Sequence, residues 1–201
     1  EIAAKAADYI RLGKQRLLSF EVPGGGFSLF GQSPASVALT AYGMMEFADM
    51  ARVEPVDPKL LERTAAWVAR QQGGDGSWTG ALYETGVPLR DSLASTAYVT
   101  WAMSQYKPDC EAARLGRGCV ARNLAAARDA HTLALCANAL LAGGDSGEAR
   151  DAMRRLAALA VQAGKDQRYW PAAGARMTYS FGRYADVETT ALAALALSHE
   201  A

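Results

Sequence analysis

A short stretch that recurs along the chain constrains the fold more than any other feature of this sequence. At its clearest occurrence, residues 71–78 read QQGGDGSW, between one helical segment and a second that begins near Ser92. Glycine readily adopts the left-handed backbone that ends a helix, and Asp-Gly favours a turn. The stretch predicts a three-part unit: an amphipathic outer helix, a glycine turn that delivers an aromatic side chain to a packed position, and an apolar inner helix.

The same unit occurs on both sides of this stretch. PGGGF at residues 23–27 precedes the apolar segment 36–45, and RYW at residues 168–170 precedes the apolar segment 186–195. The three aromatic residues, Phe27, Trp78 and Trp170, lie 51 and 92 residues apart. The second spacing is about twice a period of roughly 46 residues, and residues 129–141 have the inner-helix pattern without the turn. Such a period predicts an array of helical hairpins.

Hydrophobic periodicity and capping signals divide the chain into four outer–inner pairs. The first outer helix is expected to bury Ala6, Ile10, Gly13 and Leu17. Asp57-Pro58 is expected to begin the second outer helix, and Asp145-x-x-Glu148 is expected to form a capping box for the fourth. The expected outer helices cover residues 3–20, 57–70, 111–127 and 145–162; the expected inner helices cover 36–53, 91–106, 129–141 and 186–199, with a long loop at 164–184.

Pairs of this kind predict an all-α fold, an α/α toroid in which outer helices surround inner ones. A closed toroid takes about six hairpins, so four pairs are expected to form an open arc whose end helices expose apolar faces. We therefore expect a single domain over residues 1–201 that is a partial toroid, truncated at both ends.

Composition narrows the possible partners. The chain has 201 residues, of which 50% are hydrophobic and 21% charged, and its formal net charge is zero. This balance indicates a globular domain and gives no electrostatic reason for binding nucleic acid or an acidic membrane surface. No run approaches 18 apolar residues, so no membrane insertion is expected.

Three cysteines, Cys110, Cys119 and Cys136, are an odd number without a C-x-x-C spacing. The simplest interpretation is that they are small buried apolar residues. A Cys110–Cys119 bridge is an alternative in an exported protein, and a metal site with His131 is a further one, although the spacings match no zinc pattern.

Several segments, taken in order, resemble the thioester domain of the alpha-2-macroglobulin family, especially its bacterial members. They are residues 9–20, 25–31, 39–42, 67–78, 178–182 and 185–192, which read YIRLGKQRLLSF, GGFSLFG, LTAY, WVARQQGGDGSW, TYSFG and ADVETTAL. The resemblance implies a non-catalytic domain of a protease inhibitor that traps its target proteases after they cleave a bait segment. It also implies contact with other domains of the same chain, and an extracellular or periplasmic location.

The sequence departs from this family at two points. The thioester motif Cys-Gly-Glu-Gln is absent, and Cys136 lies within a predicted inner helix with no Gln three residues later. In the family, the motif lies upstream of the first helix present here. The histidine that assists thioester transfer in some members is absent from residues 79–86; Tyr83 or Glu84 is the expected nearest residue to a thioester in the parent protein, or else an ordinary solvated loop residue.

Enzymes with an α/α-toroid fold are the alternative to a non-catalytic inhibitor domain. A terpenoid cyclase needs clustered acids, for which Asp186 and Glu188 are candidates, although Asp186 also fits a helix cap. A prenyltransferase would need zinc ligands such as Asp109, Cys110 and His131, although Asp109 fits a cap. A glycosidase would need two carboxylates, for which Glu84 and Asp91 are candidates.

Histidine and aromatic residues complete the candidates. His131 and His199 have no serine or cysteine elbow to act with, so packing or surface roles are expected. The aromatic residues Phe27, Trp78 and Trp170 could form a platform that binds carbohydrate. Their position before the inner helices fits better with a packing role as wedges between neighbouring hairpins.

Overall fold

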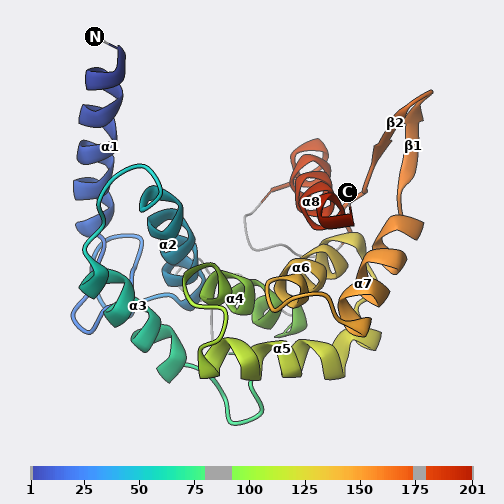
Figure 1. The fold of residues 1–201 in the computed structure, drawn as a ribbon, viewed down its shortest axis with the longest axis horizontal. Coiled ribbons are helices and arrows are strands. Elements are labelled where there is room, and N and C mark those ends of the chain that lie inside the picture. Colours follow the sequence, from blue (N-terminus) through green and yellow to red (C-terminus); the bar gives the residue numbers. More distant parts are fainter. Residues whose placement is uncertain (1, 80–91, 174–179, 201) are drawn as a thin grey trace. The chain divides into compact units, whose positions relative to one another are not determined.

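A computed structural model describes residues 2–79, 92–173 and 180–200 (Figure 1). The regular elements among the described residues are helices and one small hairpin, and the described residues form two compact units. Unit 1 comprises residues 2–72, and unit 2 comprises residues 73–79 together with 92–173 and 180–200. The predicted all-α class of the α/α-toroid type is confirmed.

Unit 1 contains three helices whose starts follow from local sequence. They are α1 (Ile2–Leu18), α2 (Val37–Met50) and α3 (Pro58–Arg70). The Ser36 side chain caps α2 by accepting from the Leu39 N–H. The Asp57 side chain accepts from the Lys59 N–H with Pro58 in the first turn, so the predicted start of α3 is confirmed.

The buried face predicted for α1 is wrong. Ala6 and Gly13 are exposed, and Ile10 and Leu17 are only half-buried. Tyr9 and Leu12 are also exposed on this helix. The periodicity correctly identified an amphipathic helix, but the described residues supply little to cover its apolar side.

Unit 2 has two layers of helices (Figure 1). The inner helices α4 (Ser92–Tyr106), α6 (Ala130–Leu141) and α8 (Arg183–Leu197) pack side by side, with α6 in the middle. The outer helix α5 (Glu111–Asn123) packs on α4 and α6, and α7 (Gly147–Ala158) packs on α6 and α8. Short 3-10 turns at Leu124–Ala126 and Ser198–Glu200 follow α5 and α8. Because α6 has neighbours on all sides, every residue from Ala130 to Leu140 is buried.

Two details of the fourth pair differ from the prediction. The N-cap of α7 is Ser146, whose side chain accepts from the Ala149 N–H, and not Asp145, which pairs with Arg150 on the surface. α8 begins at Arg183, after Gly182 with φ of 53°. Asp186 therefore lies within its first turn instead of capping it.

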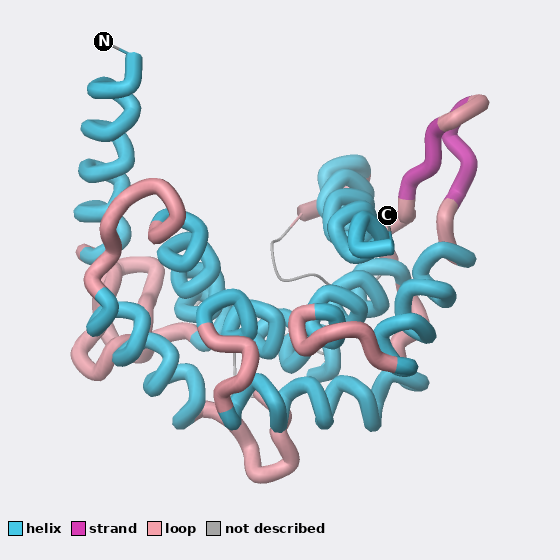
Figure 2. Tube along the Cα trace, in the orientation of Figure 1, coloured by secondary structure: helices cyan, strands magenta, loops and turns pink. Residues whose placement is uncertain are grey.

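A β-hairpin occupies part of the predicted outer helix and long loop. β1 (Val161–Gly164) pairs antiparallel with β2 (Gln167–Tyr169), and Val161 faces Tyr169 (Figure 2). α7 therefore ends at Ala158 and does not reach residue 162. The hairpin was not predicted because its strands are three and four residues long. So few residues cannot show the alternation of period two by which a strand is recognised in a sequence.

Each glycine turn packs tightly against the outer helix that follows it in the chain. A Cβ added to Gly25 would lie 2.8 Å from the Arg63 carbonyl oxygen, and one added to Gly76 would lie 2.4 Å from that of Leu115. Both glycines have positive φ, 96° and 88°. The turn thus brings its backbone against the next outer helix.

Replacing Gly76 with alanine tests this close approach. The new Cβ would collide with the Leu115 carbonyl in a strained left-handed backbone, so Gly76→Ala should lower the free energy of unfolding by about 2 kcal/mol or more. Gly74→Ala is the matched control, because no atom lies within 4 Å of its added Cβ. Urea unfolding followed by circular dichroism measures both variants, and equal losses would contradict the wedge.

Candidate functional site

The three aromatic residues that precede inner helices, Phe27, Trp78 and Trp170, are anchored in the same way. In each, the backbone N–H donates to a threonine hydroxyl on the following inner helix: Phe27 to Thr40 at 2.9 Å, Trp78 to Thr96 at 3.0 Å, and Trp170 to Thr190 at 3.1 Å. The side chains are at most 9% exposed. A carbohydrate platform needs open ring faces, so these buried rings serve packing.

The degenerate third pair replaces the aromatic anchor with an aspartate. The Asp129 side chain accepts from both the N–H and the hydroxyl of Thr132, at 3.0 and 2.8 Å. Arg155 of α7 donates to the carbonyl oxygens of Leu124 and Ala127 in the segment before α6. A threonine near the start of every inner helix is thus the common feature, which the apolar pattern of these helices did not single out.

Two threonines of α4 offer a matched test of this anchor. Thr96→Val removes the acceptor of the buried Trp78 N–H, so we expect a loss of about 1–3 kcal/mol in unfolding free energy. The Thr100 hydroxyl is buried without a hydrogen-bond partner in the described structure. Thr100→Val should therefore change stability by no more than about 0.5 kcal/mol, or increase it. Thermal and urea unfolding of the two variants compare them, and an inverted order would refute the anchor.

A polar cluster links the inner helices α6 and α8. The Nε2 atom of His131 lies 3.3 Å from Glu188 Oε1, and the Ser180 hydroxyl donates to Glu188 Oε2. His131 is buried, as expected of a packing histidine, and Glu188 is only partly exposed. Asn138 adds a second link between these helices by donating to the Leu192 carbonyl oxygen at 3.1 Å.

The order of groups in this cluster does not match a nucleophilic triad. In such a triad the histidine stands between the hydroxyl and the carboxylate, so that it takes the proton of the nucleophile. Here the carboxylate of Glu188 stands between Ser180 and His131. The arrangement ties the segment before α8 to α6.

The acids considered for toroidal enzymes have other partners. Asp186 accepts from the Ala172 N–H at 2.8 Å, which fixes the chain after Trp170. The N-cap position of α5 is held by Cys110 without a side-chain bond, so Asp109 is not the expected cap. Among the described residues, no group of three or more His, Cys, Asp or Glu could hold a metal ion. Tyr83, Glu84 and Asp91 lie outside the described residues.

All three cysteines carry free thiols, so the alternative Cys110–Cys119 bridge is not formed. Cys119 and Cys136 are buried. Burial, and next the charge of Asp75, raise the pKa of the Cys119 thiol. A raised pKa disfavours the thiolate, so Cys119 lacks the activation of a reactive cysteine.

The carboxylate of Asp75 stabilises the turn before Trp78. One oxygen accepts from the hydroxyl and the N–H of Ser77, at 2.7 and 3.0 Å. Hydrogen bonds from the Ser77 side chain and backbone lower the pKa of Asp75. Arg122 also donates to its main-chain carbonyl oxygen at 2.7 Å.

A lowered folded-state pKa gives a definite pH dependence. The stabilisation by Asp75 is present above the unfolded pKa of about 3.9 and is lost as the pH falls through the lower folded value. Asp75→Ala should therefore be less stable than wild type at pH 7, and the difference should shrink below about pH 4. Urea unfolding at pH 7, 5 and 3 gives the comparison; a difference independent of pH would contradict the role of the carboxylate.

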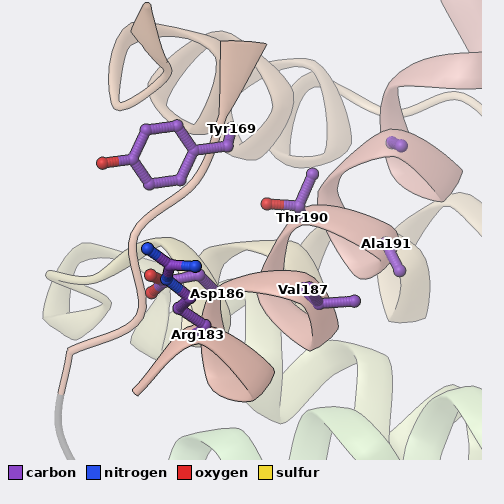
Figure 3. Close-up of a pocket in the computed structure, with 7 residues that line it drawn as sticks. Tyr169, Arg183, Asp186, Val187, Thr190 and Ala191 are labelled. Atoms are coloured by element: carbon purple, nitrogen blue, oxygen red, sulfur yellow. The ribbon is translucent and has the colours of Figure 1, made fainter. Parts of the chain in front are cut away.

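An open groove lies between β2 and α8 in unit 2 (Figure 3). Its volume is about 510 Å³. The ring of Tyr169 borders it on the β2 side, and α8 supplies the rest: Arg183, Asp186, Val187, Thr190, Ala191 and Ala194. The lining is mostly apolar, with one basic and one acidic side chain.

None of the described helices is long and apolar enough to cross a membrane.

These features define a helical-hairpin domain of the α/α-toroid class with anchored aromatic turns. The family model for the A-macroglobulin TED domain matches residues 1–201. The chain therefore belongs to the alpha-2-macroglobulin family, as its thioester domain, and the expected resemblance is confirmed.

Individual relatives agree with the family match. Ovostatin of Gallus gallus is 29% identical over 109 residues, which cover 51% of this chain and 7% of ovostatin. Thioester-containing protein 1 allele S3 of Anopheles gambiae is 24% identical over 201 residues, covering 95% of this chain and 14% of that protein. Allele R1 is 24% identical over 176 residues, or 83% of this chain and 13% of that protein. The chain thus spans no more than about one seventh of the length of these relatives.

Proposed function

We propose that this chain is a non-catalytic domain of a protease inhibitor that traps its targets after they cleave a bait segment. The observation that carries the proposal is the family match over the whole of residues 1–201. The partners are target proteases, bound through the intact parent protein, and the other domains of that protein. The extracellular or periplasmic location, and a bacterial origin, rest on the sequence resemblance.

Within the parent, the chain acts as a scaffold. The features that support this role are the buried aromatic turns, the Glu188-centred link between α6 and α8, and the absence of a Cys-Gly-Glu-Gln motif from the sequence. Cys136 is fully buried in the middle of α6 and has Ala139 three residues later, where a thioester would need Gln. Any thioester of the parent therefore lies outside these residues. The domain continues, in this proposal, into further hairpins of the same toroid.

Exposure of the intact parent to proteases tests the trap. We expect a broad-specificity protease to cleave the parent once, to change its mobility on a native gel, and to remain active on small substrates while losing activity on proteins. A protease inactivated at its active site is the control and should leave the mobility unchanged. The isolated 201-residue chain should not inhibit. Cleavage without a mobility change, and without shielding from protein substrates, would refute protease trapping.

A further inference from the structure

We draw no further inference here: the strongest candidate, the surface patch at Phe30 in the loop between Phe27 and α2, exposes 81% of that residue, but nothing in the structure shows what covers it.

Discussion

The hydrogen bond from a backbone N–H to a threonine hydroxyl is the interaction that holds each of the three aromatic residues in place. It fixes the aromatic residue of the turn against the inner helix that follows, in the pairs of Thr40, Thr96 and Thr190. At the turns before Phe27 and Trp78, a glycine packs against the backbone of the next outer helix. Arg70 or Arg122 of that helix donates a hydrogen bond to a carbonyl oxygen of the same turn. The turns at Phe27 and Trp78 are therefore each joined to the next outer helix by one local set of contacts, as in other repeat proteins.

Much of this organisation could be predicted from the sequence. Local sequence is sufficient to predict three features. They are the Gly-Asp-Gly-Ser-Trp turn, the alternation of amphipathic and apolar helices, and the start of α3 at Asp57-Pro58. The β-hairpin and the early start of α8 were missed because their residues carry weak propensities. The buried face of α1 was predicted wrongly because periodicity shows which side of a helix is apolar, but not whether a neighbour covers it.

The site-level features depend on contacts between distant parts of the chain. His131 and Glu188 are 57 residues apart, and nothing in either segment alone indicates that they meet. In the sequence, Arg70 and Arg122 look like ordinary surface charges. Their role is visible only in the structure, where they donate to the carbonyl oxygens of Gly24 and Asp75, which lie 46 and 47 residues earlier in the chain.

The hairpin of β1 and β2 separates the outer and inner helices of the last pair. Its two strands bond to each other, and most of their side chains are exposed. Lys165 and Asp166 at the tip take no part in the helix layers, so the length of this ribbon can vary without disturbing the layers. The tip is consequently a good attachment point for a fluorophore or an epitope tag, from which movements of the domain inside a much larger protein can be followed.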